Sequence, residues 1–149
     1  DLKTSVCEFV VKGVKSLVRK ARIEDWVDYE SERVYLRGYC MSPGVRICVA
    51  DSLESVHPLF RLHKGDMDRV VEWPFQHWFK LRVVHPKRAE EQEIEEWVDG
   101  VEISCGRPQT GHRQSPWSCV RWFCLEDLIR KGYVENDQLR MKFELLLML

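Results

Sequence analysis

The chain has 149 residues, of which 44% are hydrophobic and 32% are charged, and 23 basic against 24 acidic residues give a net charge of −1. This length fits one domain, residues 1–149, which buries roughly 70% of its unfolded surface. The charge balance argues against nucleic-acid binding, and no apolar run approaches the roughly 18 residues that a membrane span needs. We therefore expect a domain with no nucleic-acid or membrane partner, and no signal peptide is visible at its start.

The six cysteines contain no Cys-x-x-Cys pair, and five of them lie in apolar, strand-like runs. We predict buried free thiols and a reducing, cytoplasmic location. The five histidines lack metal-ligand spacing such as His-x-x-x-His, so we predict no metal site and no cofactor. Cysteine catalysis is a competing interpretation, with Cys105 or Cys119 as nucleophile and His112 as base.

Alternation of apolar and polar residues predicts eight short strands. These cover residues 4–11, 34–41, 45–50, 59–63, 77–85, 101–105, 117–124 and 138–147. The triplet Ser42-Pro43-Gly44 predicts a turn that joins two of the strands into a hairpin. After that turn, Val45 and Ile47 share one face, whereas Arg46 and Cys48 share the other.

The connections are predicted from their turn and capping residues. Residues 13–27 mix helical spacing with polar residues and are predicted to be an irregular connection, and residues 51–57 and 106–116 are predicted to be polar loops. The acidic run over residues 90–96 is predicted to be a solvated face with one helical turn.

Two short helices are predicted. Asp66 favours one over residues 66–71, because its carboxylate can accept from free N–H groups of the first turn. Residues 125–131 favour the other, with acidic residues early and basic residues late. Trp73-Pro74-Phe75 then closes a corner whose aromatics we expect in the core. The fold class is all-β: an eight-stranded antiparallel β-sandwich with one or two short helices.

Four motifs follow one another in an order typical of a known family. They are GYCMSPGVRICV, LF…KGDMDRVVEWPF, the Gly-Arg-Pro at residues 106–108, and the closing LEDLIRKGYVENDQLRMKFEL. Their order resembles the TRAF C-terminal (MATH, meprin and TRAF homology) domain over residues 9–144. The resemblance implies an eight-stranded antiparallel sandwich without enzymatic activity.

The resemblance also implies a function and partners. It implies an adaptor that binds short linear peptide motifs of receptor cytoplasmic tails or signalling proteins along an edge strand. It further implies a ubiquitin-linked TRAF signalling protein that trimerises through a coiled coil outside these residues. A substrate-recognition module of a ubiquitin-ligase adaptor or a deubiquitinase shares the fold and is the alternative.

The resemblance places a peptide groove on individual residues. Arg46 stands where the family often has a groove arginine that meets an acidic or polar ligand side chain, and Cys48 replaces a groove tyrosine. Leu59 stands at an aromatic floor position, and Trp97 lies within one position of another. Some members carry a run of serines before the Arg-Pro pair, and in this chain Ser104 is the one serine at those positions.

The segment from Trp117 to Cys119 falls on the strand that would pair with the peptide. The residues expected to bind peptide are therefore Arg46, Cys48, Leu59, Trp97, Ser104, Trp117, Ser118 and Cys119. The ordinary alternatives stay open: Arg46 as a solvated strand charge, and the two tryptophans as packing residues.

Overall fold

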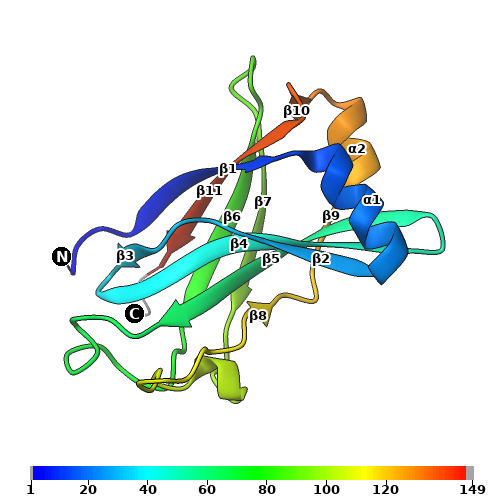
Figure 1. The fold of residues 1–149 in the computed structure, drawn as a ribbon. Coiled ribbons are helices and arrows are strands. Elements are labelled where there is room, and N and C mark those ends of the chain that lie inside the picture. Colours follow the sequence, from blue (N-terminus) through cyan, green and yellow to red (C-terminus); the bar gives the residue numbers. More distant parts are fainter. Residues whose placement is uncertain (1, 147–149) are drawn as a thin grey trace.

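Two antiparallel sheets, called A and B, form the body of the molecule. In Figure 1 the strands of sheet A run behind those of sheet B. The computed structural model describes residues 2–146. Sheet A contains, in spatial order, β1 (Val6–Lys12), β11 (Gln138–Leu145), β6 (Trp78–Val84) and β7 (Glu91–Trp97), with β10 (Val134–Glu135) also paired to β11. Sheet B contains β2 (Trp26–Glu30), β4 (Tyr39–Ala50), β5 (Leu53–His63) and β8 (Trp117–Ser118), with β3 (Val34–Leu36) beside β4 and β9 (Phe123–Cys124) beside β5.

The predicted class, an all-β antiparallel sandwich with one or two short helices, is confirmed. Eight of the described strands have three or more residues, and β8, β9 and β10 have two each. The helices are α1 (Val14–Glu24) and α2 (Leu125–Arg130), and a single 3₁₀ turn, η1 (Ile103–Cys105), precedes β8.

Aromatic side chains fill the space between the sheets. The ring of Phe60, from sheet B, lies 5.0 Å from that of Phe75 and 5.1 Å from that of Trp117. The ring of Phe79, from sheet A, stacks on Phe143 at 5.4 Å. Phe75 is fully buried, and Trp73 packs partly buried against the same core. The predicted aromatic corner is thus confirmed.

Strand β4 runs straight through the triplet that predicts a turn. The Pro43 carbonyl accepts a hydrogen bond from the Ser31 N–H at 2.9 Å, which places it on the β2 side of the strand. The missing N–H of Pro43 falls on that same side, just beyond the end of β2, so no bond between β4 and β5 is lost. The predicted hairpin turn was therefore wrong. The real turn lies at Asp51 and Ser52, and β5 occupies most of the predicted polar loop over residues 51–57.

The backbone of β2 passes unusually close to Gly44. A Cβ atom at this position would lie 2.0 Å from the Tyr29 carbonyl oxygen, closer than a real Cβ can approach. Glycine is therefore required for β2 to pair with β4 here. It also leaves β4 without a side chain between Glu30 and Leu59, the residues opposite it on β2 and β5.

Helix α1 replaces the irregular connection predicted over residues 13–27. Val14, Val18 and Ala21 are buried against the core, so the helical spacing of the apolar residues was the correct signal. The first turn is capped from a distance, because the Asp137 carbonyl accepts from the Gly13 and Val14 N–H groups, each at 3.1 Å. The partner lies in the turn before β11, which local sequence could not indicate.

Three further predictions were wrong in detail. The acidic segment is strand β7 and not a helical turn, and two of its glutamates, Glu93 and Glu95, lie opposite Arg82 and Lys80 of β6. Residues 66–71 form hydrogen-bonded turns that are too short for a helix. The predicted strand over residues 101–105 is absent, and η1 occupies its last three residues. The predicted strand over 117–124 is divided into β8 and β9.

The predicted strand over residues 34–41 is divided by a turn at Arg37 and Gly38 into β3 and the start of β4, and three of the cysteines predicted to be buried are only partly buried. Other predictions agree with the described residues. Helix α2 lies where it was predicted, and all six cysteines are free. The last predicted strand is β11; residue 147, its predicted end, lies outside the described residues. No helix within residues 2–146 is long and apolar enough to cross a membrane.

Candidate functional site

The surface of sheet B that faces away from sheet A carries polar and charged side chains, and we call it the outer face. Alternation along each strand sends apolar side chains into the core and leaves the intervening ones outside. The strand register aligns Asp28 with Arg46 and Arg46 with His57 in one row across β2, β4 and β5. In a second row, Glu30, Gly44, Leu59 and Ser118 lie opposite one another.

Arg46 is held by three neighbours. Its Nε donates to Asp28 Oδ1 at 2.7 Å and its Nη2 to Asp28 Oδ2 at 3.0 Å, a two-pronged pair. Its Nη1 donates to Ser118 Oγ at 3.2 Å, and its guanidinium lies 4.1 Å from the centre of the Trp26 ring. The hydrogen bonds to the Asp28 carboxylate raise the pKa of Arg46, so the guanidinium stays charged. Arg46 thus joins β2, β4 and β8, with 23% of its side chain exposed.

A second pair lies beside the first. Arg61 donates from Nε and Nη2 to the two carboxylate oxygens of Glu30, both at 2.8 Å, and from Nη1 to the Gln114 carbonyl. It reaches from β5 to β2 across β4 at the gap left by Gly44. Arg113 adds an ion pair to Glu30 at 3.6 Å. The hydrogen bonds from Arg61 lower the pKa of Glu30, which holds it ionised.

His57 connects the row of Arg46 to the segment after β8. Its Nδ1 lies 2.8 Å from the Cys119 carbonyl oxygen, and because a carbonyl only accepts, Nδ1 is the donor. Its Nε2 lies 2.9 Å from Ser55 Oγ. The imidazole is therefore used on both sides by the protein itself.

Strand β8 forms one edge of sheet B, and β2 lies at the opposite end. The Cys119 N–H donates to the Pro58 carbonyl at 2.9 Å, so Cys119 faces β5. Successive residues of an antiparallel strand point their backbone groups to opposite sides, so the N–H and C=O of Ser118 point away from β5. In the described part of the chain no further strand pairs with β8 on that side. One backbone donor and one acceptor are thus presented beside Arg46.

The structure brings three of the eight predicted residues together. Arg46 and Ser118 are hydrogen-bonded, and Cys48 follows on the same outer face, where burial raises its pKa. Leu59 lies on this face too but is fully buried. Cys119 is also buried, and it meets His57 through its backbone.

The last three of the eight predicted residues lie away from this face. Trp117 points into the core, with 9% of its surface exposed, and stacks on Phe60. Trp97 belongs to β7 in sheet A, where its ring lies 5.9 Å from that of Trp78. Ser104 is buried in η1, with its hydroxyl 3.4 Å from a Glu102 carboxylate oxygen.

The competing cysteine mechanism finds no support in the geometry. Burial raises the pKa of Cys105 to about 11 and also raises that of Cys119, which disfavours the reactive thiolate. Within the part of the chain that the structure describes, no hydrogen bond joins His112 to either thiol.

Sequence reasoning missed the acidic halves of both ion pairs. Asp28 and Glu30 follow the segment predicted to be irregular, and no strand was predicted over them. The run Trp26 to Glu30 does alternate, with polar residues at every second position, and this was the available signal. That Asp28 would meet Arg46 could not be predicted, because it depends on the register of β2 against β4.

Residues 30–142 match the family described as TRAF/meprin, MATH domain. The chain belongs to this family. MATH domains are protein-interaction modules without catalytic activity, which fits a site made of an open strand edge and a polar face.

One solved structure shows how far the likeness of this MATH domain extends. TRAF5 of Notothenia coriiceps superposes with a TM-score of 0.73 at 17% sequence identity, and the match covers 97% of this chain and 74% of that one. At this identity the likeness supports the fold alone. No curated protein matches the chain.

One prediction concerns the stability of this MATH domain. Replacing Arg46 by alanine should lower the free energy of unfolding by about 1–2 kcal/mol, because Asp28 loses two charge-assisted hydrogen bonds while it keeps some contact with water. Urea unfolding followed by fluorescence measures the change. The matched control is Arg22→Ala, which removes an exposed pair with Glu54 (2.7 Å) and should cost under about 0.5 kcal/mol. Equal effects of the two changes would contradict the assignment.

Proposed function

We propose that this MATH domain binds short extended peptides of receptor cytoplasmic tails or signalling proteins, and that the peptide joins sheet B along β8. The observation that carries this proposal is the pair of backbone groups of Ser118 at the free edge. A peptide strand that pairs there satisfies groups that otherwise face water.

Arg46 is the side chain best placed to read the peptide. A guanidinium has five N–H groups, and three are used by Asp28 and Ser118, which leaves two for a ligand. Because Asp28 already balances the charge of Arg46, the ligand group opposite it need not be acidic. We propose that it is a polar side chain or a peptide carbonyl, with Trp26 beside it as an exposed aromatic surface.

The wider role is proposed on the same basis. We place the domain in a cytoplasmic, ubiquitin-linked TRAF signalling protein that trimerises through a coiled coil outside these residues. Trimerisation would raise the apparent affinity of modest single sites by roughly 10²–10⁴. Free thiols fit a reducing compartment.

The proposal is tested at Ser118. Peptides selected from a phage-displayed library against the wild-type domain should lose most of their affinity for Ser118→Pro, roughly tenfold or more, because proline removes the N–H from the free edge. The ladder to β5 does not use this N–H, so thermal unfolding should show a folded domain. Fluorescence polarisation of labelled peptides measures the affinity.

Ser118→Ala is the matched control. It removes the hydroxyl that accepts from Arg46 but keeps the backbone N–H, so it should weaken binding by roughly threefold or less. If a folded Ser118→Pro variant binds the selected peptides as tightly as the wild type, the peptide does not pair with β8 and the proposal fails.

A further inference from the structure

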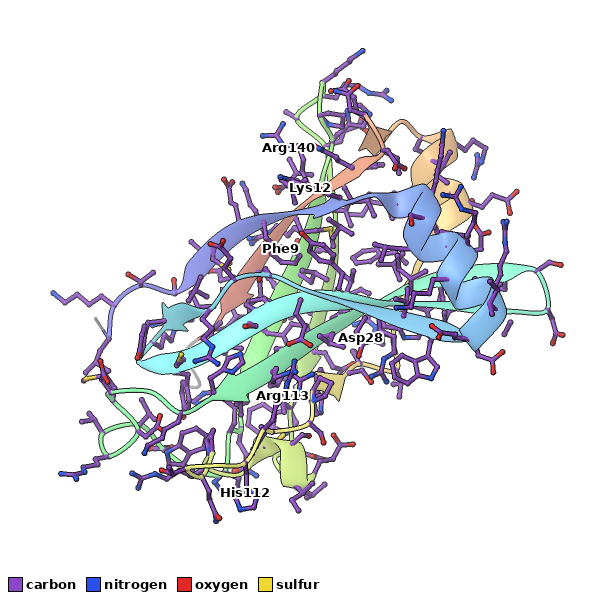
Figure 2. All side chains as sticks on the ribbon, in the orientation of Figure 1. Phe9, Lys12, Asp28, His112, Arg113 and Arg140 are labelled. Atoms are coloured by element: carbon purple, nitrogen blue, oxygen red, sulfur yellow. The ribbon has the colours of Figure 1, made fainter. Side chains whose placement is uncertain are left out.

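A concave surface lies at the end of the outer face, away from α1. It is a cavity of about 710 Å³ enclosed by the connection after β2, the ends of β4 and β5, and the loop that leads to β8. Figure 2 shows two of its lining residues, His112 and Arg113, on this loop below the end of β5. The Lys64 side chain extends from the end of β5 to the loop, where its ammonium group donates to Thr110 Oγ1 at 2.5 Å.

The cavity collects positive charge in a chain that is slightly acidic overall. Arg33, Lys64 and Arg113 line it, and Arg61 lies directly beside it. Glu30 and Glu32 are the two acidic residues of the lining, so three lining cations, with Arg61 beside them, face two carboxylates. The whole chain has a net charge of −1, which makes this excess local.

The acidic residues leave part of this charge uncompensated. Both oxygens of Glu30 already accept from Arg61, and its remaining attraction is shared with Arg113. Among residues 2–146, no carboxylate lies within 4.0 Å of the cationic groups of Arg33 or Lys64. Arg33 and Lys64 therefore bring to the cavity positive charge that no adjacent carboxylate neutralises, and N–H groups that can donate to a ligand.

His63 lies among these charged side chains. Burial lowers the pKa of its imidazole most and Arg33 lowers it further; Glu30 opposes this effect, and Arg61 and Arg113 add smaller lowering effects. Its Nε2 lies 2.8 Å from the Ser42 hydroxyl, which also lines the cavity. The site therefore combines cations with neutral hydroxyl donors around one space.

We propose that this cavity binds a phosphorylated serine or threonine side chain of a protein partner. A phosphate monoester carries nearly two negative charges and three acceptor oxygens, which suits a guanidinium, an ammonium and hydroxyl groups converging from three segments. A single carboxylate would use fewer of these donors. A protein ligand follows from the membership of an interaction family. The site uses none of the β8 edge, so it does not depend on peptide pairing with Ser118.

The test uses two synthetic peptide pools with degenerate flanking positions, identical except that the central serine is phosphorylated in one of them. We expect the wild-type domain to bind the phosphorylated pool at least about tenfold more tightly, and the double variant Arg33→Ala/Lys64→Ala to lose that preference. Both residues are exposed, so the variant should unfold at the wild-type temperature.

Arg19→Ala/Lys20→Ala is the charge-matched control, because it removes the same two charges from the exposed face of α1. It should keep the preference, and so should Ser118→Pro. Inorganic phosphate should compete with the phosphorylated pool, whereas anionic vesicles without peptide should not be retained. Equal binding of the two pools, or equal losses in the two double variants, would overturn the proposal. Loss of the preference in Ser118→Pro would also overturn it, by showing one continuous site.

Discussion

Replacing Trp117 by alanine should lower the free energy of unfolding by about 3–5 kcal/mol. Its indole lies between the sheets, stacked on Phe60 at 5.1 Å and edge-on to Phe79 at 5.6 Å, so its removal leaves a cavity that both sheets line. The sheets are regular and cannot collapse fully into that space. Urea unfolding at constant denaturant slope measures the loss.

Trp122→Ala is the matched control, because this tryptophan follows β8 by only a few residues but is 43% exposed. It should cost under about 1 kcal/mol. A peptide-contact role and a core role give opposite results at Trp117. If Trp117→Ala keeps wild-type stability and loses only peptide affinity, the core assignment is wrong.

Replacing Arg61 by alanine should lower the free energy of unfolding by about 2–4 kcal/mol at pH 7. Arg61 is 9% exposed, and its loss leaves Glu30 without two hydrogen bonds and the Gln114 carbonyl without a donor. The control is Arg113→Ala, whose exposed side chain meets the same Glu30 from 3.6 Å. It should cost under about 1 kcal/mol. Comparable losses in the two variants would show that Glu30 senses only general positive charge.

Acid should reduce the contribution of Arg61. The pKa of Glu30 is lowered in the folded state, so its pairing contributes fully above the ordinary glutamate range, near pH 4.3, and is lost as pH falls toward the lower folded value. The difference in unfolding free energy between wild type and Arg61→Ala should therefore shrink as the pH falls below about 4.3, the ordinary pKa of glutamate. Denaturant unfolding at several pH values measures it. A difference that stays constant with pH would mean that Arg61 stabilises the fold by packing alone.

The features that sequence predicted well are those carried by local pattern. Alternation correctly separated Val45 and Ile47 from Arg46, and the Trp73-Pro74-Phe75 corner was correctly assigned to the core. The motif order was enough to indicate the family and therefore the sandwich. Each of these signals lies within a short stretch of the chain.

The features that sequence missed are set by partners far along the chain. The start of α1 is capped by Asp137. Strand β4 accommodates Pro43 because β2 ends at Glu30, opposite Gly44, so β2 does not need the N–H that proline lacks. The pairing of Arg46 with Asp28 depends on the register of β2 against β4, which the sequence did not indicate. Such pairings depend on which strands become neighbours, and this information is absent from any single segment.

The shortness of β8 sets how this domain can discriminate among ligands. Ser118 offers an added strand one donor and one acceptor, so main-chain pairing there contributes only about 1–3 kcal/mol. Micromolar binding needs about 8 kcal/mol. In the peptide complex that we propose, most of the affinity then comes from the ligand's side chains, which would make this edge selective for particular residues. A longer open strand at this position would accept a wider range of extended segments.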